Sequence, residues 1–308
     1  MNELAILSPI AAIILTGWAL VRFNIVKRET FRDNNAILYW LAIPATLVRL
    51  VAGVDLAGGD NLNLVLAVYA SYLIMPAIGW AAGKFSGENK DRQAISAMVS
   101  MRSNQIFIGL PAIAIAMGTK GLEPLSVYLA VSLVGYHMIS VAASQIVLSG
   151  GVSPRAILES AKKLAVNPMV LACLIGAAFS LSGINKFPHP ADVTLKVLGE
   201  IGTGMALLAV GAGLSFGALP SLLKKTWKDC LIKLIVHPAV LWGLFLLWPV
   251  DGAMMQVSVF ASAMPVAVNT MVASQGMGMD YRYAGETIAV TTVLSAVTIP
   301  LWIRLLGI

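Results

Sequence analysis

The stretch "MRSNQIFIGLPAIA", residues 101–114, decides how this chain folds, because it places four polar side chains in a row within an otherwise apolar run. A second stretch, "SAMPVAVNTMVASQG" at residues 262–276, also puts a proline and several polar residues inside an apolar run. Proline in a helix interior removes a backbone donor and clashes with the preceding turn. Each stretch is therefore predicted to interrupt a helix.

Composition points to a membrane protein. Of the 308 residues, 58% are hydrophobic and 12% are charged, whereas soluble globular chains average about 25% charged residues. Apolar segments of about 20 residues, the length that crosses a hydrocarbon core about 30 Å thick, recur along the whole sequence. The expected fold class is an all-α integral membrane protein, and the net charge of +6 is attributed to basic loops rather than to a nucleic-acid partner.

The apolar runs between polar residues predict ten transmembrane helices. Their expected bounds are 4–21, 35–53, 62–82, 94–117, 124–149, 165–182, 193–216, 229–249, 252–277 and 284–306. The first run is read as a retained span, because "MNELAILSP" lacks the basic residues of a cleaved signal.

Basic residues are concentrated in, or beside, the loops that follow the odd-numbered spans. Fifteen of the 21 lie there: Arg22, Lys27, Arg28, Arg32, Lys84, Lys90, Arg92, Arg155, Lys162, Lys163, Lys224, Lys225, Lys228, Lys233 and Arg282. Lysine and arginine favour cytoplasmic loops, so these loops are predicted to be cytoplasmic and both termini to be outside.

The odd number of spans in each half predicts an inverted repeat. Residues 1–155 and 156–308 would each hold five spans, and the second half would be upside down relative to the first. Inverted repeats are a recurrent plan of secondary transporters, whose substrates bind near the bilayer midplane between the halves.

The two interrupted spans, 4 and 9, hold the candidate substrate site. Arg102 lies roughly 12 Å into its span, and a charge at such depth costs about 2.5–3.5 kcal/mol, which makes it a candidate for function. Half-helix N-termini attract anions, and the planar guanidinium suits a carboxylate. The expected substrate-binding residues are Arg102, Ser103, Asn104, Gln105, Pro111, Pro265, Asn269 and Thr270.

Some of these residues have structural alternatives. Gly109 and Pro111 are expected to weaken span 4, and Pro265 to interrupt span 9, although proline in a membrane helix often only kinks it. Arg102 has the alternative of a structural pairing with Glu200 or a backbone carbonyl.

Three further titratable residues lie within predicted spans: Glu200, His137 and His237. They are candidates for coupling transport to protons, and the histidines have the alternative of hydrogen-bonded core residues. No metal site or cofactor is expected, because neither the histidines nor Cys173 and Cys230 show ligand spacing.

The sequence contains a match to an enzyme motif, but not in the structural context that the motif requires. "GLSFG" at residues 213–217 matches the nucleophile elbow of serine hydrolases in letters, but that motif needs a strand before it and a helix after it. Here it ends an apolar span. The chain is expected not to be an enzyme, and a passive channel remains the alternative to a carrier.

The chain resembles the auxin efflux carrier family, a group that also includes bacterial malonate and malate permeases. The resemblance covers nearly the whole chain and lies in the order and spacing of several fragments rather than in any one of them. They are "LAIPATLV" (41–48), "SNQIFIGLP" (103–111), "NPMVLACLIGAAFS" (167–180), "GMALLAVGAGLSF" (204–216), "KLIVHPAV" (233–240), "SAMPVAVNTMVASQGMGMD" (262–280) and "TTVLSAVTIPLWIRLL" (291–306).

This resemblance implies a scaffold of spans 1, 2, 6 and 7 and a mobile unit of spans 3–5 and 8–10, moving as an elevator in a homodimer. Asn104, Pro111, Pro265 and Asn269 would then lie where the broken spans cross. The short middle loop, and Gly204 and Met205 where many relatives have proline, argue against auxin as the substrate.

The expected function is a secondary transporter, or uniporter, of a small organic anion, a mono- or dicarboxylate, in the bacterial inner membrane. A coupled proton or sodium ion and membrane lipids are the expected partners. Another small metabolite, such as an amino acid or an auxin-like weak acid, remains the alternative substrate.

Overall fold

The computed structural model describes residues 3–53, 62–150, 162, 165–166, 168–183, 187–213 and 219–308. Within these ranges all regular structure is helical, apart from one isolated antiparallel bridge between Ser103 and Val266. The expectation of an all-helical protein is confirmed for this part of the chain.

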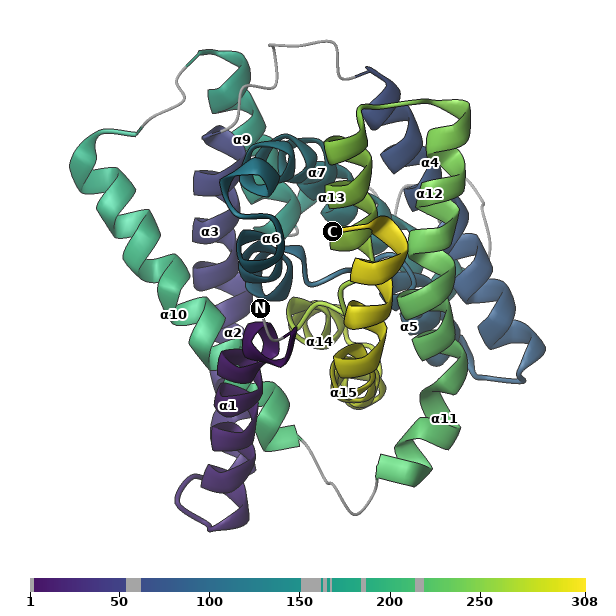
Figure 1. Ribbon diagram of the computed structural model, residues 1–308. Coiled ribbons are helices and arrows are strands. Elements are labelled where there is room, and N and C mark those ends of the chain that lie inside the picture. Colours follow the sequence, from purple (N-terminus) through teal and green to yellow (C-terminus); the bar gives the residue numbers. More distant parts are fainter. Residues whose placement is uncertain are drawn as a thin grey trace.

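Figure 1 shows the described helices, coloured in their order along the chain. The first half contains α1 (Glu3–Arg22), α2 (Arg28–Ile37), η1 (Leu38–Ala42), α3 (Ile43–Ala52), α4 (Leu62–Phe85), α5 (Lys90–Val99), η2 (Gln105–Gly109), α6 (Leu110–Met117) and α7 (Thr119–Ser149). The second half contains α9 (Pro168–Leu181), α10 (His189–Gly213), α11 (Leu219–Leu231), η4 (Ile232–Val236), α12 (His237–Leu247), α13 (Gly252–Ser262), α14 (Asn269–Gly276) and α15 (Tyr281–Leu306).

Four helical segments within the described ranges are long and apolar enough to cross a membrane: Leu62–Phe85, Lys120–Ser149, Leu219–Leu247 and Tyr281–Leu306. They overlap the predicted spans 3, 5, 8 and 10. Predicted spans 4 and 9 are each divided into shorter helices, α5 with α6 and α13 with α14. A helical membrane protein is therefore supported, while the count of ten spans and the inverted repeat stay predictions.

The helices pack in two groups. Helix α1 packs on α10 and α3 packs on both α9 and α10, on the left of Figure 1. Helices α4, α5 and α7 pack together and meet α12 and α13, while α11 and α14 pack on α15.

Two glycines bring α1 and α10 into backbone contact. A Cβ atom on Gly211 would overlap the Ile14 carbonyl oxygen, and one on Gly17 would overlap the Leu208 carbonyl oxygen. Any larger residue at either position would force the helices apart. Such close approach through small residues is a common way for membrane helices to associate.

Three π-helices, η1, η2 and η4, each end two residues before a proline. The prolines are Pro44, Pro111 and Pro238, each the second residue of the α-helix that follows. Proline cannot donate to the carbonyl four residues before it and tends to clash with it, and in each of these cases a π turn directly precedes the helix that contains the proline. These prolines therefore modify a helix without ending it.

At η4, a side chain from another helix donates to the carbonyl that proline leaves without a helical donor. Pro238 lacks an N–H for the carbonyl of Leu234, and that oxygen instead accepts a hydrogen bond of 2.8 Å from Trp302 Nε1 on α15. The exchange keeps a buried backbone group paired and fixes α15 against η4.

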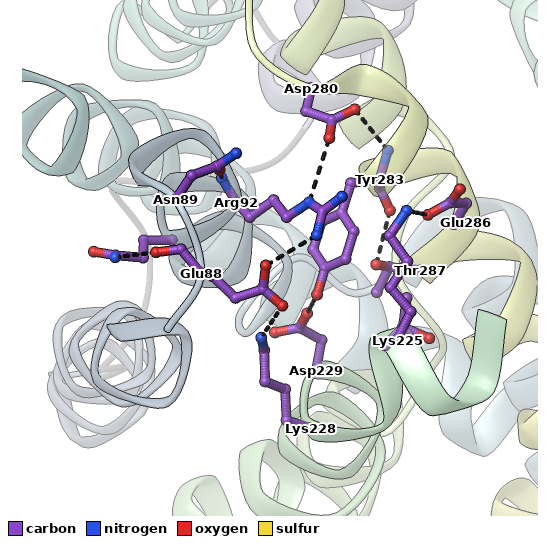
Figure 2. Close-up of polar contacts among 12 residues, drawn as sticks. Glu88, Asn89, Arg92, Lys225, Lys228, Asp229, Asp280, Tyr283, Glu286 and Thr287 are labelled. Carbon is purple, nitrogen blue, oxygen red and sulfur yellow. Dashed lines mark hydrogen bonds and ion pairs between the residues drawn. The ribbon is translucent and has the colours of Figure 1, made fainter. Parts of the chain in front are cut away.

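A network of charged residues joins the loop before α5 to α11 and to the start of α15 (Figure 2). The Glu88 carboxylate accepts hydrogen bonds from Lys228 Nζ at 2.8 Å and from Arg92 Nη1 at 3.1 Å. Arg92 Nε lies 3.5 Å from an oxygen of Asp280, and the guanidinium stacks 5.1 Å from the ring centre of Tyr283.

The Tyr283 hydroxyl in turn donates to the fully buried carboxylate of Asp229. Lys225 pairs with Glu286 next to it. The network therefore ties both broken spans to the helices that flank them, through the start of α5 and the loop between α14 and α15.

Glu88 gives this network a pH dependence. Burial raises the pKa of its carboxyl, but the hydrogen bonds from Lys228 and Arg92 outweigh that effect and hold the pKa below its ordinary value of 4.5. A depressed folded-state pKa stabilises the protein above the unfolded-state pKa and loses that effect as the pH falls through the folded value. We expect the free energy of unfolding in detergent to fall on acidification from about pH 7 to about pH 3.

Glu88→Gln should flatten this acid dependence and cost about 1.5–3 kcal/mol at neutral pH, the range for hydrogen bonds to charged groups. The matched control is Glu29→Gln, at an exposed position of α2, which should leave the profile as in the wild type. Identical profiles for all three proteins would contradict the assignment.

Candidate functional site

The two predicted interruptions meet in space. The chain leaves the helical conformation at residues 100–104, between α5 and η2, and at residues 263–268, between α13 and α14. There the Asn104 N–H donates to the Pro265 carbonyl at 2.8 Å, and the Ala267 N–H donates to the Arg102 carbonyl at 2.9 Å. The two segments thus cross as an antiparallel pair and satisfy each other's backbone groups.

The position of the first break differs from the prediction. The sequence places it near Gly109 and Pro111, but in the structure Pro111 is the second residue of α6, and its side chain lies outside the described part. The polar residues before η2 are unwound instead. Gly109 N–H reaches back to the Asn104 carbonyl at 2.9 Å, which forms the π turn. Pro265, in contrast, lies within the second break as predicted.

Arg102 is completely buried and fastens the first break to the second. Its Nε donates to Thr270 Oγ1 at 3.0 Å, Nη1 to Ser140 Oγ at 2.8 Å and Nη2 to Asn269 Oδ1 at 2.9 Å. Its guanidinium also stacks on Tyr136, 4.6 Å from the ring centre, at cation–π distance. Arg102 therefore fixes the first turn of α14 against α7.

Asn269 is oriented by two donors. Besides Arg102, the Tyr136 hydroxyl donates to Asn269 Oδ1 at 3.3 Å. Because the amide oxygen is held in this way, the NH₂ group is the part of the Asn269 side chain that can donate to a ligand.

Both ends of the Gln105 side-chain amide are hydrogen-bonded to other protein groups. Its Nε2 donates to the hydroxyls of Tyr72 and Tyr128, both at 3.2 Å, and its Oε1 accepts from Ser132 at 3.1 Å. All four side chains are buried. This cluster holds the start of η2 in place, which makes Gln105 chiefly a positioning residue.

A small cavity lies between the crossing segments, α7 and α3. Its volume is about 30 Å³, room for about two water molecules. Ser103, Asn104, Gln105 and Asn269 of the predicted site line it, while Arg102 and Thr270 lie behind that lining. Among the described residues, the lining is Ile43, Thr46, Leu47, Ser103, Asn104, Gln105, Ile106, Leu133, Tyr136, His137, Ala267 and Asn269, and none of these is acidic.

Of the three coupling candidates, only His137 lies at this cavity. Its imidazole packs edge-on against Tyr136, with ring centres 4.7 Å apart, and within the described ranges neither ring nitrogen has a hydrogen-bond partner. His237 is buried elsewhere, beside Lys233 on the same helix.

Glu200 does not lie at the site. Its side chain is 65% exposed on α10 and faces Lys196 at 3.8 Å, one helical turn away. The predicted alternative of a pairing between Arg102 and Glu200 is therefore wrong, because the carboxylate points outward while the guanidinium is enclosed by α7 and α14.

Comparison with known proteins places nearly the whole chain in one family. The family described as "Membrane transport protein" matches residues 5–303. A protein of Rhizobium meliloti named "Putative malonate transporter" is 23% identical over 296 residues, covering 94% of this chain and 92% of that protein.

Two other relatives match over different lengths. A protein of Methanothermobacter thermautotrophicus named "Uncharacterized transporter" is 22% identical over 299 residues, covering 95% of both chains. "Auxin efflux carrier component 6" of Arabidopsis thaliana is 26% identical over 112 residues, covering 35% of this chain and 20% of that protein.

The geometry predicts a large energetic role for Arg102. Arg102→Met leaves the oxygens of Thr270, Ser140 and Asn269 without this donor, and we expect it to lower the free energy of unfolding by about 3 kcal/mol. Ser140→Ala removes one of the three contacts and should cost about 1 kcal/mol. Unfolding in detergent provides the measurement, and equal stability of Arg102→Met and the wild type would refute this role.

Proposed function

This chain belongs to the membrane transport protein family, and we propose that it carries small organic anions, mono- or dicarboxylates, across the bacterial inner membrane. One observation carries the proposal. The cavity at the crossing of the two broken spans is lined by Asn104 and Asn269 and, within the described part of the chain, by no acidic residue, and the guanidinium of Arg102 is hydrogen-bonded to Asn269.

Electrostatics favours an anion at this place. Arg102 touches Asn269 and Thr270, the first two residues of α14, and a helix N-terminus carries a partial positive charge. The guanidinium therefore adds to a field of the same sign. A carboxylate in the cavity would offset both charges while it accepts hydrogen bonds from the Asn269 amide and from Asn104.

In this proposal Arg102 acts through Asn269 rather than by direct contact. Its guanidinium donors already reach Thr270, Ser140 and Asn269, and it lies behind the cavity lining. We therefore assign substrate contacts to Asn104 and Asn269, and positioning roles to Arg102, Gln105 and Thr270.

The size of the cavity supports alternating access. A dicarboxylate is several times larger than a water molecule, so about 30 Å³ describes a closed state. Ile43, Thr46 and Leu47 of α3 form one wall, and the crossing segments with α7 form the other. We propose that the group containing α4–α7 and α11–α15 moves as an elevator past α1, α3, α9 and α10, and so opens the site.

The proposed membrane orientation and the proposed homodimer rest on the sequence. The distribution of lysine and arginine supports termini on the outside, and the family resemblance supports a homodimer formed through the scaffold helices. Malonate is the first substrate to test, because the Rhizobium relative that covers nearly the whole chain is named for it.

The proposal is tested by uptake into proteoliposomes that contain the purified protein. A panel of labelled malonate, malate, monocarboxylates, an amino acid and an auxin-like weak acid identifies the substrate class. Saturable exchange of at least one carboxylate supports a carrier. Single-channel currents in planar bilayers, or no flux of any carboxylate, would refute it.

We expect Asn104→Ala and Asn269→Ala each to lower the affinity for the transported carboxylate about tenfold or more. Each removes a hydrogen bond to a charged group, worth about 1.5–3 kcal/mol, and about 1.4 kcal/mol corresponds to tenfold. Glu200→Gln is the control and should retain wild-type affinity, because Glu200 is exposed on α10. Wild-type affinity in both asparagine variants would move the site elsewhere.

The positioning role of Arg102 predicts a specific non-additivity. If the guanidinium acts through Asn269, Arg102→Met should weaken substrate binding in the wild type but add little in the Asn269→Ala background. Binding of labelled carboxylate to the four purified proteins measures this cycle. Full additivity would show that Arg102 acts independently of Asn269.

A further inference from the structure

Lys233 is fully buried in the middle of a membrane helix. The pattern of basic residues assigns it to the flank of a cytoplasmic loop, but in the structure it lies in η4, between α11 and α12. Its ammonium group donates to the Ser262 carbonyl at 2.6 Å and lies 3.2 Å from His237 Nδ1. Across the part of the chain that the structure describes, no carboxylate lies within ion-pair distance of Lys233.

The contact with Ser262 connects Lys233 to the candidate substrate site. Ser262 is the last residue of α13, the end of a helix that carries a partial negative charge. Its carbonyl also accepts a hydrogen bond of 2.9 Å from the hydroxyl of Ser103, which lines the cavity. One carbonyl and one hydroxyl therefore separate the Lys233 ammonium from the place proposed for the anion.

Lys233 and His237 form a pair that accepts one proton. At 3.2 Å one nitrogen donates and the other accepts, and two cations at that distance in a buried site would repel each other strongly. The pair is therefore either neutral or singly positive.

The described neighbours of this pair do not supply a charge that would fix its protonation state. Among the described residues, the titratable group that faces the pair is Tyr72 on α4, with its ring centre 6.5 Å from that of the imidazole. Helix α13 offers the Ser262 carbonyl, and α15 contacts η4 through Trp302, whose indole N–H binds the Leu234 carbonyl. As far as the described ranges extend, no charged side chain of these three helices contacts the pair.

We propose that Lys233 and His237 form the proton site that couples transport to the proton gradient, an inference that rests on the proposed function. The neutral pair takes one proton from the solution on the side where the anion enters, and its charge changes from 0 to +1. The positive pair and the bound anion favour each other, and this linkage is reciprocal. On the opposite side the anion leaves, the proton is released, and the neutral pair returns with the empty carrier.

The test uses labelled malonate and sodium-free proteoliposomes with the voltage clamped at zero. With the outside more acidic by about one pH unit, coupling of one proton per anion accumulates malonate about tenfold above protein-free liposomes. Lys233→Arg keeps a positive charge, but a guanidinium does not release its proton. It should retain malonate exchange at equal pH and lose the accumulation.

Lys228→Arg is the matched control, because it makes the same substitution one to two helical turns earlier, at a residue paired with Glu88. It should accumulate malonate as the wild type does. Accumulation by Lys233→Arg to the wild-type level would overturn the inference and leave Lys233 as a cap of α13.

The outcomes for the wild type separate the two proposals. Malonate exchange without accumulation under the pH gradient, or accumulation driven by a sodium gradient alone, overturns the proton site and leaves the carrier function standing. No exchange of malonate or of any other carboxylate overturns the carrier function itself. Should Lys233→Arg fail to fold, proton uptake by the wild type in weakly buffered detergent solution decides: about one proton per bound malonate is expected, and none would refute the site.

Discussion

The short antiparallel contact between residues 102–104 and 265–267 is the constraint on which the rest of the structure depends. In a bilayer core an unpaired backbone N–H or carbonyl costs several kcal/mol, so an isolated break in a spanning helix is unfavourable. Here each break supplies the partners of the other. That pairing lets non-helical backbone persist inside the protein, and it brings two half-helix ends and the side chains of Asn104 and Asn269 to one place.

The sequence predicted the two breaks and the polar part of the cavity lining, because polar residues and proline together at bilayer depth are unfavourable in a continuous helix. The sequence placed the first break too far along the chain. Pro111 follows the π-helix η2 and lies inside the helix that continues from it, whereas the break comes earlier, at residues 100–104. The surroundings of three charged residues were not predictable from the sequence. Arg102 lies behind the cavity lining, Glu200 faces outward, and Lys233 is buried. Positions along the sequence give depth, but only packing shows which face of a helix a side chain occupies.

Three prolines share one local feature, because each follows a π-helix. Pro44, Pro111 and Pro238 all follow the same five-residue turn, yet their neighbourhoods serve separate purposes. Before Pro44, η1 leads into the α3 wall of the cavity. Before Pro111, η2 begins with the anchored Gln105. Before Pro238, η4 carries Lys233.

Two cations are fully buried within the described ranges, Arg102 and Lys233. They contact opposite ends of half-helices, and this difference gives them different chemistry. Lys233 contacts the C-terminal carbonyl of α13, so its charge meets a partial charge of opposite sign. Arg102 contacts the first two residues of α14, where the helix field has the same sign as the guanidinium. In the proposed function, the positive charge on the Arg102 side is therefore the one that an incoming anion offsets. The two proposals made for this chain use both places: the anion binds beside the Arg102 end of the crossing, and the proton binds at the Lys233 end.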